Sequence, residues 1–171
     1  MTFTSGSGAV GIANMALNKK GMNFVKDKNY EGFFMARSAD GKPATVWAVL
    51  ESYDGSVKYA EKSFVVSGSD WEKYSFDDLI PDADDNKGRF TLELREAGSA
   101  DFGYVYLQPG EWGRFEGLNV RKDVAEKLKE EGLTVLRMGG GTTSPKEYRW
   151  KGMIGPLEER LSLIHIWSLS L

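Results

Sequence analysis

The feature that most constrains this chain is a series of strand-like stretches, rich in aromatic and β-branched residues, that recur at roughly ten-residue spacing. They cover residues 30–37, 44–50, 57–66, 71–80, 88–96 and 101–107. Turn formers such as Asp54-Gly55 separate them. Short strands at this spacing are typical of sandwiches and barrels. We therefore predict an all-β body built as a β-sandwich.

Two of these stretches differ in the polarity of their faces. In residues 89–95 apolar side chains alternate with polar and charged ones, which predicts a strand with one face in the core and one in water. In residues 101–107 neither face is polar, because Phe102, Tyr104 and Tyr106 are expected on one side and aliphatic residues on the other. This second strand is predicted to be central or to form a ligand platform.

After Pro109 the pattern changes from strand to helix. Residues 120–131 place apolar side chains four positions apart with charges between them, which predicts an amphipathic helix. Gly132 stands where a left-handed helix cap belongs, and the apolar residues 133–138 predict a short buried strand. A helix followed at once by a strand is typical of α/β proteins. These elements therefore predict the opening of an α/β domain that needs many more units to close.

The predicted domain organisation has three parts. A β-sandwich occupies residues 3–110, a short α/β remnant occupies 111–160, and a tail occupies 161–171. The tail, LSLIHIWSLSL, has neither helical nor strand periodicity, resembles a translated DNA-library adaptor, and is interpreted as non-native. It is also too short to span a bilayer. An incomplete α/β domain exposes strand edges and apolar surface, so we expect self-association through the remnant unless the tail covers it.

Composition excludes several classes of function. The net charge of −3 and the pI near 5.3 give no basic surface for nucleic acid or an anionic membrane. The chain has no cysteine, which excludes disulfides, thiolate zinc sites and a cysteine nucleophile. Its one histidine, His165, lies in the tail, where a Ser/His couple would require the tail to fold back. No signal-peptide pattern is visible at the N-terminus, and the compartment stays open.

Four motifs in the last quarter of the chain resemble one known family. They are LRMGGG at 136–141, YRWK at 148–151, IGP at 154–156 and EER at 158–160. Together they resemble the start of the catalytic barrel in the α-L-arabinofuranosidases of glycoside hydrolase family 51, although Met138 and Gly139 replace the usual aromatic residue and proline. The earlier segments GAVGIANM, YEGFFMAR and VYLQPGEWGR are similar to the jelly-roll, carbohydrate-binding-module-like domain that accompanies this barrel.

The resemblance implies a retaining hydrolase whose two catalytic glutamates lie on later barrel strands than those present here. Retaining chemistry needs these carboxyl groups about 5 Å apart, so we predict that the chain is not an enzyme. Only Arg137 matches a substrate-pocket residue of the family. Residual hydrolysis would require an unrelated site built from Asp and Glu. A bacterial parent enzyme, secreted or periplasmic and recovered as a gene fragment from a metagenome, fits the resemblance.

The resemblance and the composition together favour sugar binding without catalysis. Such binding uses aromatic faces that stack on sugar rings, with a few polar groups beside them. The candidates are Trp47, Tyr53, Tyr59, Trp71, Tyr104 and Tyr106, with the polar Glu51 and Arg95. The expected ligand is a plant cell-wall polysaccharide, namely arabinoxylan, arabinan or a related glucan. The alternative for each aromatic residue is core packing, and the alternative function is a structural domain that braces the parent hydrolase.

No cofactor is predicted, with one open alternative. Asp82, Asp84 and Asn86 are spaced like the oxygen ligands of a calcium loop, but the glycine that such a loop requires comes one position late. A solvated acidic turn is therefore the favoured interpretation. Glycines 139–141 suggest a phosphate cradle only weakly, because no Lys-Ser/Thr pair follows them in register.

Overall fold

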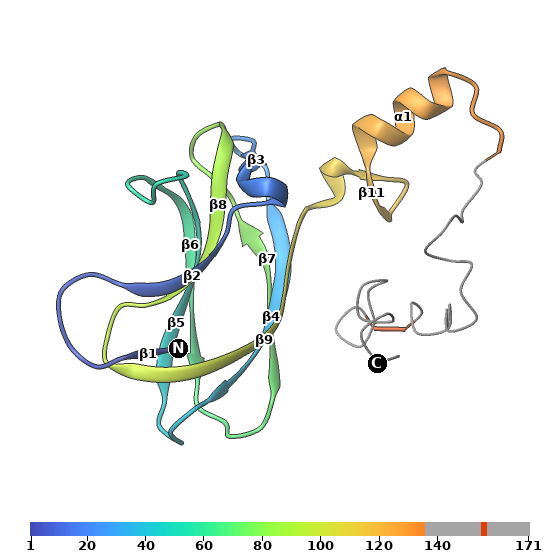
Figure 1. The fold of residues 1–171 in the computed structure, drawn as a ribbon. Coiled ribbons are helices and arrows are strands. Elements are labelled where there is room, and N and C mark those ends of the chain that lie inside the picture. Colours follow the sequence, from blue (N-terminus) through green and yellow to red (C-terminus); the bar gives the residue numbers. More distant parts are fainter. Residues whose placement is uncertain (136–154, 157–171) are drawn as a thin grey trace, which may run out of the picture. The chain divides into compact units, whose positions relative to one another are not determined.

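A computed structural model describes residues 1–135 and 155–156 of the chain (Figure 1). The chain divides into two compact units, Met1–Ala125 and Glu126–Leu171. The first unit holds the strands, and the helix α1 begins in it and ends in the second. No helix in the described part of the chain has the length and apolar character that a membrane crossing requires.

The described residues contain eleven strands, two short 3-10 helices and one α-helix. The strands are β1 (Thr2–Phe3), β2 (Val10–Asn14), β3 (Met22–Phe24), β4 (Tyr30–Ser38), β5 (Ala44–Glu51), β6 (Lys58–Val66), β7 (Glu72–Leu79), β8 (Asp85–Leu94), β9 (Gly98–Pro109), β10 (Arg114–Phe115) and β11 (Leu118–Arg121). The helices are the 3-10 turns Leu17–Lys19 and Glu111–Gly113 and the α-helix α1 (Lys122–Glu130).

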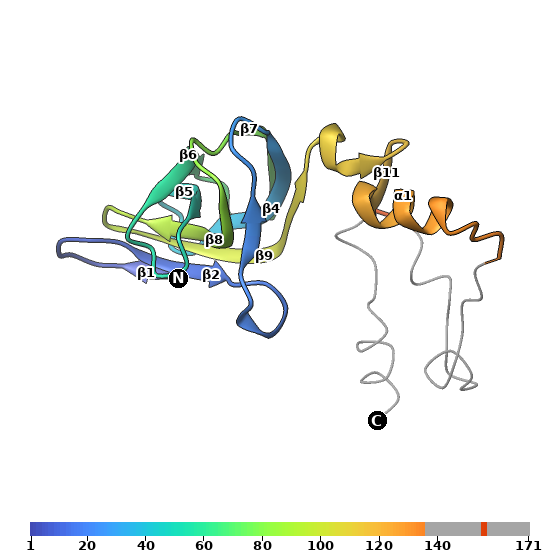
Figure 2. The same ribbon diagram turned by 90° about the horizontal axis from the view of Figure 1, so that it is seen from above.

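Two antiparallel sheets form the sandwich (Figures 1 and 2). We call them the β4 sheet, with the order β1-β9-β4-β7, and the β5 sheet, with the order β2-β8-β5-β6 and with β3 also paired to β8. The earliest strands pair with the latest, and most successive strands change sheet, which is the arrangement of a jelly roll. The predicted all-β sandwich is confirmed.

The core lies between the two sheets and consists of alternate residues of each strand. Aromatic side chains join the sheets across it. Phe34 of β4 meets Phe64 of β6 edge-on, with 5.2 Å between ring centroids, and Phe76 of β7 lies 5.9 Å from Phe90 of β8. Phe34 and Phe90 are at most 2% exposed. This burial of large rings from four strands fixes which face of each strand points outward.

All six predicted strands are present, with ends that differ from the predicted bounds by only a few residues. The strands that were not predicted, such as β2 and β3, are short and carry no clear alternation of apolar and polar residues. Their pairing to β8 defines them as strands, and a partner so distant in sequence leaves no local signal.

The helical prediction is confirmed for the described residues. Helix α1 occupies the middle of the predicted range, and Gly132 has a left-handed φ of 75°. The amide of Leu133 donates to the carbonyl of Leu128 at 3.0 Å, which satisfies one carbonyl of the last turn. Residues 133–135 of the predicted strand 133–138 are not in a strand, and the remainder lies outside the described residues.

The predicted face of Phe102 is wrong, because β9 contains a bulge. Ala36 pairs with Phe102 and Phe34 pairs with Val105, so β9 has one more residue than β4 in this interval. The extra residue turns Phe102 toward the core, where its ring lies 6.1 Å from that of Phe34. Tyr104 and Tyr106 stay on the outer side.

Candidate functional site

The outer face of the β4 sheet carries a cluster of aromatic side chains. Phe33 of β4 packs against two tyrosines of β9, with ring centroids 5.6 Å from Tyr104 and 5.8 Å from Tyr106. The two tyrosine rings are 6.5 Å apart. Phe33 is buried, whereas 38% of Tyr104 is exposed. In this cluster Phe33 is therefore packed against its neighbours, whereas the Tyr104 ring is accessible to solvent.

Trp71, the residue before β7, extends this cluster along β9. A methyl group added to Gly103 would lie 3.3 Å from Cζ3 of Trp71, so the indole packs against the backbone at the bulge. The tryptophan is nevertheless 45% exposed. We call Phe33, Trp71, Tyr104 and Tyr106 the aromatic strip.

Charged side chains flank the strip at the Trp71 end. Nε of Arg37 donates to Oδ2 of Asp101 at 3.1 Å, and these side chains are 41% and 39% exposed. The guanidinium carbon of Arg37 lies 4.9 Å from the centroid of Trp71. Lys73 places its ammonium group 3.8 Å from the centroid of Phe33. Aromatic faces and hydrogen-bonding groups therefore stand side by side.

A hydrogen-bond chain lies at the other end of the strip. The Tyr106 hydroxyl donates to Oε1 of Gln108 at 2.6 Å, and Nε2 of Gln108 donates to Oε1 of Glu31, also at 2.6 Å. Arg114 completes the chain, with Nη1 3.2 Å from the same carboxylate of Glu31. These contacts hold the polar groups in place beside Tyr106 before any ligand binds.

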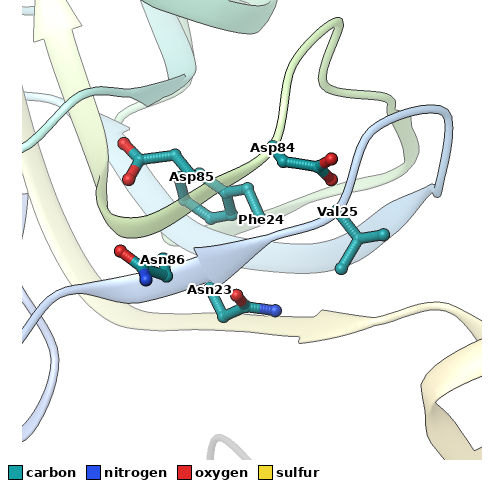
Figure 3. Close-up of a pocket in the computed structure, with 6 residues that line it drawn as sticks. All are labelled: Asn23, Phe24, Val25, Asp84, Asp85 and Asn86. Atoms are coloured by element: carbon teal, nitrogen blue, oxygen red, sulfur yellow. The ribbon is translucent and has the colours of Figure 1, made fainter.

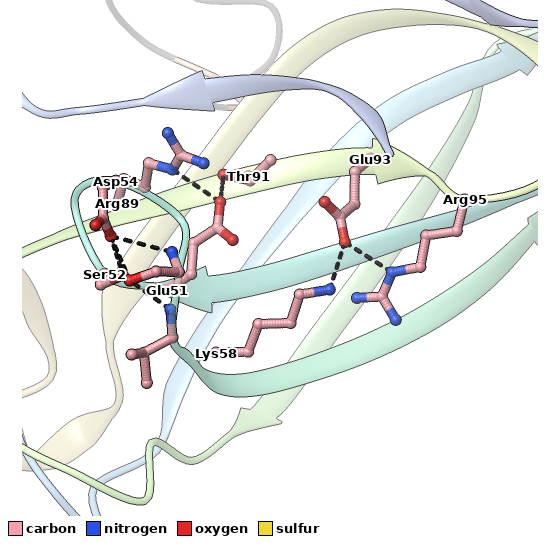
Figure 4. A network of polar contacts seen from close by, with 10 residues as sticks. Glu51, Ser52, Asp54, Lys58, Arg89, Thr91, Glu93 and Arg95 are labelled. Carbon is pink, nitrogen blue, oxygen red and sulfur yellow. Dashed lines mark hydrogen bonds and ion pairs between the residues drawn. The ribbon is translucent and has the colours of Figure 1, made fainter. Parts of the chain in front are cut away.

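The outer face of the β5 sheet is built from charged pairs instead (Figure 4). Oε1 of Glu51 accepts hydrogen bonds from Nε of Arg89 at 2.8 Å and from the hydroxyl of Thr91 at 2.5 Å. Glu51 is 2% exposed and Thr91 is 4% exposed. The predicted water-facing side of 89–95 is thus polar but covered, because neighbouring long side chains shield it.

A second carboxylate, Glu93, organises the rest of this face (Figure 4). It accepts from Nζ of Lys58 at 3.0 Å and from Nε of Arg95 at 2.7 Å. Arg95 also binds Glu61 with Nη2 to Oε2 at 2.5 Å, and this hydrogen bond lowers the pKa of the Glu61 carboxyl. The ion-pair layer consists of Glu51, Lys58, Glu61, Arg89, Thr91, Glu93 and Arg95.

The ion-pair layer covers Trp47. The guanidinium carbon of Arg95 lies 4.1 Å from the centroid of the Trp47 ring. Because two carboxylates hold Arg95 in this position, that face of the indole is occupied by the protein itself. Both tryptophans thus have an arginine over one ring face, but two carboxylates hold Arg95 over Trp47, whereas Trp71 stays 45% exposed beside Arg37.

The eight predicted sugar-binding residues do not form one site. Trp71, Tyr104 and Tyr106 lie on the outer face of the β4 sheet, and Trp47, Glu51 and Arg95 lie on that of the β5 sheet. Tyr53 lies in the turn after β5, and Tyr59 donates its hydroxyl to Oδ2 of Asp85 at 2.9 Å. Arg137 lies outside the described residues.

Sequence reasoning missed two members of the open face. Phe33 precedes the core residue Phe34 in YEGFFMAR, and strand alternation alone would have placed it outward. Gly103 had no such signal, because its role depends on Trp71, which comes from another strand.

The acidic turn before β8 borders a pocket of about 390 Å³ (Figure 3). Asp84 accepts the amide of Lys26 at 2.8 Å, and Oδ1 of Asp85 accepts the amide of Lys87 at 2.7 Å. These carboxylates thus hold the loop backbone. The residues lining the pocket are Asn23, Phe24, Val25, Asp84, Asp85 and Asn86.

The calcium loop considered at Asp82, Asp84 and Asn86 gains no support from the geometry. Within residues 1–135 and 155–156, no three His, Cys, Asp or Glu side chains are grouped as metal ligands. The hydrogen bond from Lys26 to Asp84 gives this carboxylate a structural role in the turn.

Comparison with known proteins places this fold. No family model matches the chain. It is 26% identical over 172 residues to the extracellular exo-α-L-arabinofuranosidase of Streptomyces chartreusis, a match that covers 91% of the chain and 20% of that protein. It is 28% identical over 161 residues to α-L-arabinofuranosidase 1 of Arabidopsis thaliana, covering 90% of the chain and 23% of that protein.

A solved structure shows the same fold. Arabinose-bound MgGH51 α-L-arabinofuranosidase matches 92% of the chain and 27% of its own length, with a TM-score of 0.78 and 21% identity. The resemblance to the N-terminal domain of family 51 is confirmed. The chain spans about a fifth to a quarter of the length of the curated relatives that it matches.

Proposed function

We propose that this chain is a non-catalytic carbohydrate-binding domain that binds plant cell-wall polysaccharide, namely arabinoxylan, arabinan or a related glucan. The observation that carries the proposal is the open aromatic strip, in which Trp71 and Tyr104 are 45% and 38% exposed on one sheet face. Aromatic rings of this kind bury large area at small entropic cost, and sugar C–H faces stack on them. The names of the two curated relatives, both arabinofuranosidases, support an arabinose-bearing polymer.

The polar groups at both ends of the strip support the same proposal. The side chains of Arg37 and Asp101 are 41% and 39% exposed and have donor and acceptor atoms beside Trp71. Gln108 and Glu31 stand beside Tyr106. Sugar hydroxyls need such partners, because a buried hydroxyl without one is costly.

We propose further that the chain does not hydrolyse glycosides by itself. The resemblance implies that both catalytic glutamates lie on later barrel strands, and the chain matches only 20% to 27% of the related proteins. Two carboxyl groups about 5 Å apart across the bond are required for retaining hydrolysis. Incubation of the purified chain with a nitrophenyl arabinoside tests this, and arabinose release would contradict it.

Affinity electrophoresis through gels that contain arabinoxylan, arabinan, xyloglucan or β-glucan tests sugar binding. We expect at least one polymer to retard the chain, and we expect Trp71→Ala and Tyr104→Ala to migrate freely. Tyr53→Ala is a matched control, since Tyr53 is 39% exposed and lies away from the strip. Free migration of the unmodified chain in every gel would overturn the proposal.

A second candidate function is a structural role in a larger assembly. Three aliphatic residues on or next to α1, Val120, Val124 and Leu128, are 44% to 47% exposed. Val124 and Leu128 stand four residues apart in α1, so they share one side of the helix, and Val120 lies in β11 just before it. We propose that this side packs against a second copy of the chain when no other partner is present. Sedimentation equilibrium tests this, because Leu128→Glu should then shift the chain from dimer to monomer.

A further inference from the structure

We infer that the aromatic strip binds a run of several sugar residues along the main chain of a polysaccharide rather than a single arabinofuranosyl branch. The inference rests on the proposed function. The inference starts from the order of outward groups along β9. Asp101 comes first, the Trp71 indole then lies against Gly103, and Tyr104, Tyr106 and Gln108 follow. From Asp101 to Gln108 this row measures at most about 23 Å, at about 3.3 Å per strand residue.

That length exceeds one sugar ring several times over. A single arabinofuranose is much shorter than the row, so it cannot contact the polar groups at both of its ends. A linear oligosaccharide lying parallel to β9 would contact the Trp71 and Tyr104 rings and the polar groups at either end. Only such a ligand uses all the groups that the sheet holds in place.

The bulge at Gly103 is what makes the row continuous. Without a side chain at this position, the indole of Trp71 reaches across β4 and lies against the β9 backbone. An added methyl would approach Cβ of Met35 to 3.2 Å and Cζ3 of Trp71 to 3.3 Å. Gly103 is therefore a positioning residue, because it sets the height of Trp71 relative to Tyr104.

The paired charges at the two ends of the row favour an uncharged glycan. Arg37 is paired with Asp101 at one end, Arg114 is paired with Glu31 at the other, and the Lys73 ammonium between them lies 3.8 Å from the centroid of the Phe33 ring. Each pair is internally neutral and leaves hydrogen-bonding atoms for hydroxyl groups. A polymer of acidic sugars would find no unpaired row of cations in these two pairs, whereas neutral xylan, arabinan or glucan chains need none.

Isothermal titration with arabinose and with linear xylo- and arabino-oligosaccharides of two to six residues tests the inference. We expect arabinose and disaccharides to bind weakly, affinity to increase at least about tenfold with length as a second ring is engaged, and the increase to stop once the row is covered. Polygalacturonate serves as the acidic comparison and should bind less tightly than the neutral polymers.

Two variants connect this length dependence to the strip. Gly103→Ala should reduce the affinity for hexasaccharides about tenfold while changing disaccharide affinity little, because it displaces one of two rings. Asp101→Ala should act in the same direction and more weakly, and Tyr53→Ala should have no effect. Thermal unfolding of each variant confirms that it is folded before titration.

The outcomes separate this inference from the proposed function. If polymers retard the chain but arabinose binds as tightly as a hexasaccharide, the inference is overturned and sugar binding stands. Tighter binding of polygalacturonate than of any neutral polymer would also overturn it. If no glycan binds at all, the proposed function itself fails.

Discussion

The two outer faces of the sandwich use the same strand alternation, yet one presents open rings and the other presents paired charges. On the β4 sheet Trp71 stays 45% exposed although Arg37 lies 4.9 Å from its ring centroid, whereas on the β5 sheet Arg95 lies 4.1 Å from the centroid of half-buried Trp47. The carboxylates Glu51 and Glu93 on the second face have side chains no more than 8% exposed, so their partners are committed to the fold. The comparison teaches that an outward aromatic ring is available to a ligand only to the extent that side chains of neighbouring strands leave it exposed.

The largest effect should come from the ion-pair layer. Replacing Glu51 with Ala leaves Arg89 and Thr91 without their acceptor, and Thr91 is buried. We expect the free energy of unfolding to fall by about 2–4 kcal/mol, below the upper range for buried pairs because Arg89 keeps some access to water. Urea unfolding measures this loss.

Glu51→Gln is the matched control for this change, since its amide oxygen can still accept from Thr91. Its loss of stability should be smaller. Both variants should bind polysaccharide normally once folded. If the Glu51→Ala chain were as stable as the original, the ion-pair layer would not stabilise the fold, and the proposed structural role of the β5 outer face would be wrong.

Exchanging the two tryptophans for alanine should separate stability from binding. Trp47→Ala removes the ring under Arg95 and should lower the free energy of unfolding by about 1–2 kcal/mol while polymer retardation persists. Trp71→Ala should abolish retardation and change stability by about 0.5 kcal/mol or less, as expected for a residue near the surface. If Trp47→Ala abolished binding and Trp71→Ala did not, the binding face would be the outer face of the β5 sheet and not that of the β4 sheet.

Alkaline unfolding should report on Tyr74 of β7, whose ring stacks on the core residue Phe34 with 5.4 Å between centroids. Burial, together with a hydrogen bond to Glu72, raises the pKa of Tyr74 from 10.0 to about 12. Between these values the folded state keeps a proton that the unfolded state has lost, so stability should fall as pH rises through this window. Tyr74→Phe should flatten this part of the stability curve measured by thermal unfolding, and an unchanged curve would contradict the shift.

The smallest effect should appear in acid, in the turn that joins β5 to β6. Hydrogen bonds from the Ser52 hydroxyl, and from the amide and hydroxyl of Ser56, lower the pKa of Asp54 from 3.8 to about 2. The stabilisation is present above the ordinary pKa and is lost as pH falls toward 2. Asp54→Asn should remove a small part of the acid sensitivity between these values. If the acid unfolding transition were identical in the original chain and in Asp54→Asn, the hydrogen bonds of this exposed turn would not contribute to stability.

Local sequence pattern was sufficient for much of the fold. The six main strands and α1 follow from spacing and periodicity, because side chains alternate every two residues in a strand and repeat about every 3.6 in a helix. The outward position of Trp47, Tyr104 and Tyr106 follows from the same alternation. These features depend on neighbours a few residues away, which the sequence displays directly.

The candidate site depended on contacts that no local pattern displays. The β9 bulge turns Phe102 inward and lets Trp71 lie on Gly103, and Arg95 covers Trp47 because Glu61 and Glu93 hold it there. By itself the sequence determined the six longer strands, α1 and the outward side chains within regular stretches of strand, since these depend on local periodicity. Only the tertiary structure decided which outward rings stay open, because strands distant in the sequence supply the groups that cover or support them.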